Sequence, residues 1–144
     1  MSTSLAAANQ ELIRGFWDDL YRRDFEKVAS YFAEHGRYED VPVPEGDAVG
    51  RAAVARKLRI GLSRIERYVH HLHRMLADEQ CVVTEHTEDW HFDAEHTVSL
   101  PFVSVHVIEN GKIVLWRDYW NMPTLMSGAP QWWIEYITAA WMEP

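Results

Sequence analysis

The residues of this chain with the clearest chemical potential are two acids that stand among large aromatic side chains on predicted β-strands. Asp118 lies in the segment Trp116-Arg117-Asp118-Tyr119-Trp120, and Glu88 lies two positions before Trp90. A charged group in a half-buried strand costs free energy unless it is paired or serves a function. Both acids are therefore candidates for acid–base chemistry, and a structural ion pair remains the alternative for each of them.

Strand alternation places further polar residues beside these two acids. His86 shares a strand face with Glu88, and Tyr38 and Asp40 point to the same side of a short strand predicted earlier in the chain. If these faces meet, five ionisable candidates for catalysis line one pocket: Tyr38, Asp40, His86, Glu88 and Asp118. The candidates for substrate binding form its walls: Trp90, Phe92, Leu100, Phe102, His106, Trp116 and Trp120. Tyr38 and His106 could instead be ordinary core residues.

Three carboxylates around one imidazole favour proton transfer. They cannot all ionise cheaply in an apolar pocket, so at least one should have a raised pKa and keep its proton near neutral pH. A protonated acid beside an ionised one is the arrangement that general acid–base catalysis needs. We expect no cofactor and no metal. The run His70-His71-Leu72-His73 places only His71 and His73 on one strand face, so we expect it to be structural.

Composition narrows the class of protein. The chain has 144 residues, a formal net charge of −8 and no basic stripe, which argues against nucleic acid binding. Its only cysteine, Cys81, excludes an internal disulfide and fits a reducing, cytoplasmic location. No apolar run is long enough to span a membrane, and the N-terminus lacks the pattern of a signal peptide. We expect one domain over residues 1–144.

The elements that must position these residues follow from the hydrophobic periods. Helices are predicted at residues 4–22, 24–32 and 51–66, with Gly36 ending the second, and a short strand at 37–41. The period then changes to two, which predicts strands at 68–76, 81–92, 97–108 and 112–120, the last two joined by a turn at Asn110-Gly111. This order indicates an α+β fold in which a curved antiparallel sheet wraps around N-terminal helices and leaves a pocket at its open end.

A Trp-rich tail follows the last strand. Pro130 is typical of a helix start, and a helix over residues 130–141 would place Trp133, Ile137 and Trp141 on one face. So broad an apolar face is unusual on an exposed helix. We expect the tail to close the pocket or a homodimer interface.

The stretch from Gly111 to Trp120 resembles the end of the limonene-1,2-epoxide hydrolase family, a branch of the SnoaL-like and NTF2-like superfamily. That family has a Tyr and an Asn two positions apart on its first strand, where this chain has Tyr38 and Asp40. It has an Arg and an Asp two apart on a middle strand, where this chain has His86 and Glu88. The resemblance spans about residues 12–124 and implies an NTF2-like (cystatin-like) cone with a curved, mostly antiparallel mixed sheet.

The resemblance also implies roles for these residues. In that family the Tyr and Asn hold a water that one Asp deprotonates, the other Asp protonates the epoxide, and the Arg bridges the two carboxylates. Asp118 would accordingly be the base and Glu88 the acid, with Tyr38 and Asp40 holding the water and His86 bridging. The implied activity is cofactor-independent hydrolysis of an epoxide on a small hydrophobic molecule.

Two other functions remain open. A carboxylate–His pair is also what SnoaL-like or ketosteroid-isomerase-like cyclases, isomerases and dehydratases of the superfamily use to move protons on carbon. A non-catalytic module could hold a hydrophobic ligand in the same cone. Such a module would need no carboxylate with a raised pKa, so the titration of the pocket separates binding from catalysis.

Overall fold

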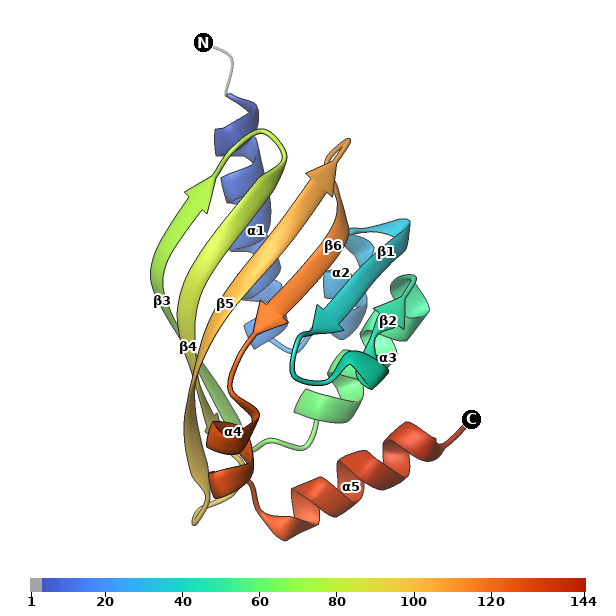
Figure 1. Ribbon diagram of the computed structural model, residues 1–144, viewed down its shortest axis with the longest axis vertical. Coiled ribbons are helices and arrows are strands. Elements are labelled where there is room, and N and C mark those ends of the chain that lie inside the picture. Colours follow the sequence, from blue (N-terminus) through green and yellow to red (C-terminus); the bar gives the residue numbers. More distant parts are fainter. Residues whose placement is uncertain (1–3) are drawn as a thin grey trace.

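The computed structural model describes residues 4–144 and consists of helices arranged around one curved, six-stranded sheet (Figure 1). The helices are α1 (Leu5–Tyr21), α2 (Phe25–Ser30), α3 (Arg51–Leu62), α4 (Met122–Gly128) and α5 (Gln131–Met142), with a 3₁₀ turn η1 (Pro44–Gly46). The strands are β1 (Phe32–Asp40), β2 (Ala48–Val49), β3 (Arg67–Ala77), β4 (Cys81–His91), β5 (Thr97–Glu109) and β6 (Lys112–Tyr119). Within residues 4–144 no helix is long and apolar enough to cross a membrane.

The order of strands brings the first strand beside the last. The sheet runs β2-β1-β6-β5-β4-β3, with β3 to β6 forming an antiparallel meander. Strand β1 joins β6 in parallel, so the sheet is mixed, as the resemblance implied. In this register Tyr38 lies opposite Trp116 and Asp40 lies opposite Asp118. The pairing therefore places two acids that are distant in sequence side by side at one end of the sheet.

The core forms between the inner face of this sheet and α1. The buried stripe of α1 includes Ile13, Phe16 and Leu20, as its three- and four-residue spacing predicted. Alternate residues of β4 and β5 are buried, which confirms the predicted inward faces of both strands. The turn at Asn110-Gly111 is also confirmed: both residues have positive φ, as a two-residue hairpin turn of this kind requires.

The structure corrects the segment between the second helix and the first strand. Helix α2 ends at Ser30, and β1 already begins at Phe32, so Gly36 is a strand residue and not a helix breaker. A Cβ at Gly36 would lie 2.7 Å from the carbonyl oxygen of Ile113 on β6, where the strand pairing shifts register. Glycine is therefore needed for close strand approach.

One other predicted boundary also differs from the structure. Helix α3 stops at Leu62 instead of continuing to Glu66, although Ile65 remains buried. Between the last strand and the tail, residues 122–128 form α4, for which no helix was predicted, with Asn121 as its N-cap accepting a hydrogen bond from the Thr124 backbone.

The tail forms helix α5, which runs across the open end of the sheet (Figure 1). Trp133 is buried, packs at 5.1 Å from the ring of Phe92, and donates its indole N–H to the Gly61 carbonyl at 3.2 Å. Arg56 of α3 hydrogen-bonds three backbone carbonyls at the C-terminal end of the tail, at residues 140, 141 and 143. The tail is thus docked on the body of the protein.

Removal of the tail should destabilise the protein. Truncation after Ala129, which preserves α4, should lower the melting temperature, and Trp133→Ala alone should cost about 3–5 kcal/mol of unfolding free energy. Trp132→Ala is the matched control, because Trp132 is exposed and should cost much less. Thermal unfolding measures the effect, and light scattering shows whether the truncation also changes the oligomer mass. Unchanged stability and mass would show that the tail is an appendage.

Candidate active site

A cavity of about 400 Å³ opens between the sheet and helices α3, α4 and α5. Four of the five predicted catalytic residues line it: Tyr38, Asp40, Glu88 and Asp118. Five of the predicted wall residues line it as well: Trp90, Leu100, Phe102, Trp116 and Trp120. Helix α5 contributes Trp133, Ile137 and Trp141, so the tail closes one side of this cavity. Three predicted residues, His86, Phe92 and His106, are buried outside the cavity lining of the described chain.

Each of the three buried acids of the cavity accepts a hydrogen bond from a tryptophan indole. This donor is neutral, so it orients the carboxyl group without cancelling its charge. The pairs are Trp116 with Asp118 Oδ1 at 2.6 Å, Trp90 with Glu88 Oε1 at 3.1 Å, and Trp120 with Asp40 Oδ1 at 2.8 Å. The aromatic residues that surround the acids in the sequence therefore hold them in place.

Glu88 lies on one wall of the cavity and accepts hydrogen bonds from two tyrosines. Tyr21 of α1 and Tyr68 of β3 both donate to its Oε2, the latter at 2.5 Å. Burial raises the pKa of Glu88 to about 7, against the opposing effect of these donors. Glu88 can therefore hold or release a proton near neutral pH. Neither tyrosine was among the residues that the sequence singled out.

Asp118 lies on β6, which is separated from the strand of Glu88 by β5 in the same sheet. Its Oδ1 accepts hydrogen bonds from Ser104 at 2.5 Å and from Trp116, while its Oδ2 has no hydrogen-bond partner in residues 4–144. Burial, followed by the nearby charge of Asp40, raises the pKa of Asp118 above its usual range. The pKa of about 7 for Glu88 agrees with the expectation that a pocket carboxyl keeps its proton near neutral pH.

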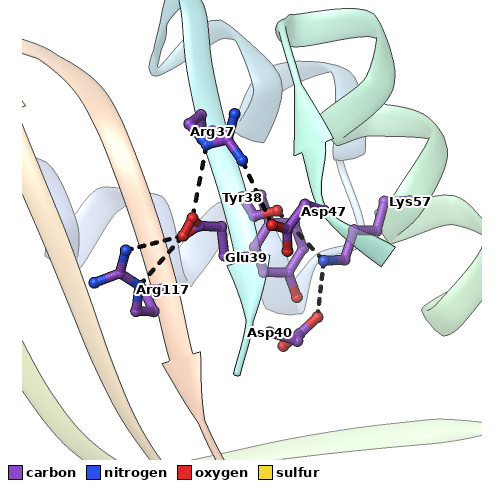
Figure 2. A network of polar contacts seen from close by, with 7 residues as sticks. All are labelled: Arg37, Tyr38, Glu39, Asp40, Asp47, Lys57 and Arg117. Atoms are coloured by element: carbon purple, nitrogen blue, oxygen red, sulfur yellow. Dashed lines mark hydrogen bonds and ion pairs between the residues drawn. The ribbon is translucent and has the colours of Figure 1, made fainter. Parts of the chain in front are cut away.

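Asp40 differs from the other two acids because it has a cationic partner. Lys57 of α3 places its Nζ 2.9 Å from Asp40 Oδ2 and 3.9 Å from the ring centre of Tyr38. Both charged side chains are largely buried, with exposed fractions of 11% for Lys57 and 12% for Asp40. Figure 2 shows this pair beside Tyr38. The intervening residue of the strand, Glu39, points to the other side, toward Arg37 and Arg117.

The Lys57–Asp40 pair leaves Asp118 and Tyr38 free to meet a ligand. Both oxygens of Asp40 are occupied, one by Lys57 and the other by Trp120. Tyr38 is fixed by stacking on Trp116, with ring centres 3.7 Å apart, and its hydroxyl makes no hydrogen bond within the described residues. The free polar atoms at this end of the cavity are thus the Tyr38 hydroxyl and Asp118 Oδ2.

His86 does not form the expected bridge between the two carboxylates. Its Nδ1 lies 3.1 Å from His70 Nε2, and its Nε2 lies 2.7 Å from the Ser104 hydroxyl. In residues 4–144 it hydrogen-bonds neither Glu88 nor Asp118 directly. Burial, together with neighbouring histidines, lowers the pKa of His86 to about 2, so its imidazole is neutral. A neutral ring cannot replace a bridging guanidinium.

The other two residues outside the cavity belong to the core. His106 is fully buried, with its ring centre 4.7 Å from that of Phe16 and 5.7 Å from that of Trp116. Burial lowers the pKa of His106 to about 3. Phe92 packs behind the wall, against Trp133. Their strand faces were predicted correctly, but the cavity lining on these faces includes Trp90 and Phe102 and not Phe92 or His106.

The remaining histidines of β3 face away from the cavity. His71 contacts Asp89 at 2.7 Å, and His73 contacts the Thr87 hydroxyl at 2.8 Å, both at exposed positions. Among residues 4–144, no group of three His, Cys, Asp or Glu side chains is placed to hold a metal ion.

Replacement of Lys57 tests the charge balance of the cavity. Lys57→Met should leave the Asp40 carboxylate buried beside Asp118 with no cation, and breaking a buried pair in this way costs about 3 kcal/mol. The loss should be larger at pH 8 than at pH 5, where carboxyl groups of the cavity are more protonated. Urea unfolding at both pH values measures it. Lys27→Met, at an exposed position of α2, is the control. Equal stability of the two variants would show that the pair contributes nothing.

The fold and the cavity define the class of protein. Helices packed on one curved, mixed, six-stranded sheet are the architecture of the NTF2-like superfamily. Within it, residues 13–116 match the model of the SnoaL-like domain, and the chain belongs to this family.

Solved structures with the same fold are described as enzymes or putative enzymes of several kinds. An epoxide hydrolase of M. tuberculosis, described as LEH-like, superposes with a TM-score of 0.72 at 24% identity, covering 93% of this chain and 95% of that one. A putative ketosteroid isomerase from Kribbella flavida gives 0.68 at 22% identity, covering 81% and 79%. A putative SnoaL-like polyketide cyclase from Jannaschia sp. gives 0.77 at 12% identity, covering 90% and 98%. These likenesses confirm the predicted fold.

Proposed function

We propose that this protein is a cofactor-independent acid–base enzyme for a small hydrophobic substrate, with epoxide hydrolysis of the limonene-1,2-epoxide hydrolase type as the first choice. The observation that carries the proposal is the pair Asp118 and Glu88. Both are buried acids with raised pKa values, and they lie on different strands of one apolar cavity. A cavity of about 400 Å³ suits a molecule of terpenoid size.

In this mechanism Asp118 is the base. A water held by the Tyr38 hydroxyl gives a proton to Asp118 Oδ2 as its oxygen forms a bond to one epoxide carbon, while Asp40, expected to help hold this water, is instead occupied by Lys57 and Trp120. The C–O bond of that carbon to the epoxide oxygen breaks, and Glu88 gives its proton to the released oxygen. The product is a diol, and each step balances with one proton taken by Asp118 and one given by Glu88.

The surroundings support these roles. Lys57 compensates the charge of Asp40, which reduces the repulsion between Asp40 and an ionised Asp118. Glu88 keeps its proton until about neutral pH because it is buried. The aromatic walls exclude bulk water and hold an apolar substrate by contact area.

A second function rests on the Tyr21–Glu88–Tyr68 cluster. A buried carboxylate that accepts hydrogen bonds from two tyrosine hydroxyls could take a proton from one carbon atom of an enone and return it to another. The isomerase and cyclase folds among the similar structures favour this alternative. A non-catalytic ligand-binding module is the third candidate.

The assembly and location of the protein are also part of the proposal. Trp132, Trp141 and Met142 of the tail are exposed apolar side chains, which supports a homodimer in which the partner covers them. The single free thiol, Cys81, suits a cytoplasmic location.

A panel of cyclic epoxides and cyclic enones tests the proposed function. We expect at least one epoxide to give a diol, and single-turnover reactions in H₂¹⁸O should place ¹⁸O in that first diol, because water attacks directly. Isomerised enones with no diol from any epoxide would overturn epoxide hydrolysis in favour of the second function. Binding of both classes, by calorimetry, with no turnover of either would favour the binding module.

A further inference from the structure

Four polar side chains form a line of hydrogen bonds across four neighbouring strands. His70 of β3 contacts His86 of β4 at 3.1 Å, His86 contacts Ser104 of β5 at 2.7 Å, and Ser104 contacts Asp118 of β6 at 2.5 Å. Of these four residues, the mechanism above uses only Asp118. We call the other three the relay residues: His70, His86 and Ser104.

The two ends of this line lie in different environments. Asp118 lines the cavity, and His86 and Ser104 are almost fully buried. His70 is half-buried. The Nδ1 atom of His70 has no hydrogen-bond partner in the described residues. The buried side-chain polar atoms without a partner in these residues belong to Asp47 and His106, so His70 Nδ1 is not one of them. The Nδ1 of His70 therefore reaches solvent, and the line connects the cavity with water at β3.

Aromatic rings insulate the line along its length. Trp17 lies 4.6 Å and Phe102 5.3 Å from the His86 ring, and Tyr21 stacks on His70 at 4.1 Å. Tyr21 of α1 stacks on His70, and the charges of His71 and His73 on the outer face of β3 and of His106 on β5 act on the pKa of one or both imidazoles. Burial lowers the pKa of His70 to about 4, so both imidazoles of the line are neutral at physiological pH.

The state of Asp118 determines the direction of every hydrogen bond in the line. When Asp118 is ionised, Ser104 donates to it, His86 donates from Nε2 to Ser104, and His70 donates from Nε2 to His86. When Oδ1 carries a proton, Asp118 donates to Ser104, Ser104 donates to His86 Nε2, and His86 donates from Nδ1 to His70. The tautomer of His86 thus follows the protonation of Asp118.

We propose that the relay residues carry the proton of Asp118 to solvent after each turnover. The carboxyl group first turns so that the oxygen protonated by the water faces Ser104. From the Nδ1–H form of both imidazoles, Asp118 then gives this proton to Ser104, Ser104 gives its own to His86 Nε2, His86 gives its Nδ1 proton to His70 Nε2, and His70 releases its Nδ1 proton to water. One proton leaves Asp118 and one enters solvent, so no other reactant is needed. The role as an exit route rests on the proposed function.

Because His86 does not bridge Glu88 and Asp118, a proton has no direct path from one acid back to the other. After hydrolysis Asp118 holds an extra proton and Glu88 lacks one, and His86 hydrogen-bonds neither Glu88 nor Asp118 directly. Glu88 and Asp118 are each only 3% exposed, so a diol filling the cavity would leave them little contact with bulk water. A hydrogen-bonded path through the sheet lets Asp118 reset while the product still fills the cavity.

The first test needs no substrate. In ¹⁵N-labelled protein, imidazole shifts identify the tautomer of His86 at each pH. We expect the Nε2–H form where Asp118 is ionised and the Nδ1–H form where it is protonated, with Asp118 followed by its ¹³C carboxyl signal. In Ser104→Ala the His86 tautomer should no longer follow Asp118. A wild-type tautomer that stays fixed through the Asp118 titration overturns the proposal.

The second test measures turnover of the epoxide identified above. Ser104→Ala and His70→Phe should lower kcat at least about tenfold in dilute buffer, less than the loss of the base itself, with KM little changed. Added imidazole should restore much of kcat, as for a broken proton path. The matched controls are Ser99→Ala and His73→Phe, exposed residues of β5 and β3 outside the line, which should keep wild-type kcat.

The outcomes separate the relay from the proposed function. Epoxide hydrolysis with an unchanged kcat in both variants overturns the relay and leaves the function standing. If no epoxide reacts but the His86 tautomer follows Asp118, the function fails and proton transfer along the line stands. His70→Phe keeps an aromatic ring on Tyr21, so a kcat loss that imidazole does not restore would indicate a structural effect and would overturn the relay.

Discussion

Replacement of Asp118 by Asn is expected to lower kcat by about a hundredfold or more on the true substrate. The side chain keeps its shape and still accepts hydrogen bonds from Ser104 and Trp116 at Oδ1, so the cavity should remain intact. What is lost is a buried carboxylate oxygen that accepts no hydrogen bond within the described residues and can take a proton from water. KM should change little, because Asn contacts the substrate as Asp does. Steady-state kinetics of the diol product measures the effect.

Stability measurements distinguish this loss from misfolding. Because the pKa of Asp118 is raised in the folded protein, its ionisation destabilises the fold as pH rises, and Asn removes that cost. The variant should therefore melt at the same temperature as wild type or higher at pH 8. Asp89→Asn is the control, because Asp89 lies on the outer face of β4 against His71. Wild-type turnover in Asp118→Asn would end the assignment of Asp118 as the base.

Local rules are sufficient for much of the sheet. The alternation of residues along β4 and β5 predicts which side chains face inward, because one face of each strand is buried and the other is not. The turn at Asn110-Gly111 is predictable because few residue pairs accept positive φ at both positions. From these two features alone, the side chains of Glu88 and Asp118 fall on inward faces of the sheet.

Contacts between distant segments are beyond the same rules. Gly36 has the sequence context of a helix breaker, but its absent side chain serves the approach of Ile113, a residue 77 positions later in the chain. The parallel pairing of β1 with β6 is likewise not visible in either strand by itself. The resemblance to a known family supplies the mixed sheet that periodicity cannot.

Lys57 carries a signal that is visible in the sequence although the residue was not among the predicted site residues. It lies three residues after Val54 on α3, within the apolar stripe and next to Leu58, so its side chain has to point toward the sheet. His70 is similar: alternation from Tyr68 places it on the inner face, while His71 and His73 face outward. Tyr21 meets Glu88 only because α1 crosses the strands, which no local pattern reveals.

The resemblance predicts where the site residues lie better than it predicts what each of them does. His86 stands where the family has its Arg, yet the structure directs its two ring nitrogens to His70 and Ser104. A neutral imidazole is shorter than a guanidinium and cannot donate from both nitrogens at once. The cation of this cavity is instead Lys57, supplied by a helix and paired with Asp40.

Activity is expected to fall as pH rises through about 7, because Glu88 must carry a proton to act as the acid and its pKa is raised to about 7 by burial. Glu88→Gln should remove this limb of the pH profile and lower kcat by about a hundredfold or more, since an amide cannot protonate the substrate oxygen. Glu88→Asp should retain part of the activity, with a carboxyl group withdrawn by one methylene from Tyr21 and Tyr68. The pH dependence of kcat in wild type, Glu88→Gln and Glu88→Asp tests the assignment of Glu88 as the acid.

The same residue should control how the stability of the free protein varies with pH. A Glu whose folded pKa is raised from 4.5 to about 7 contributes stability that is complete below pH 4.5 and is lost as pH rises through 7, by about 3 kcal/mol in total. Glu88→Gln should flatten this part of the curve, whereas Glu85→Gln, at an exposed position of β4 paired with Arg74, should leave it unchanged. If the Glu88→Gln curve kept the wild-type slope while activity lost its limb near pH 7, the limb would still belong to Glu88, and the slope would come from another group of the folded protein. If both the slope and the limb survived, Asp118 would be the titrating acid, and the roles of the two carboxyl groups would be exchanged.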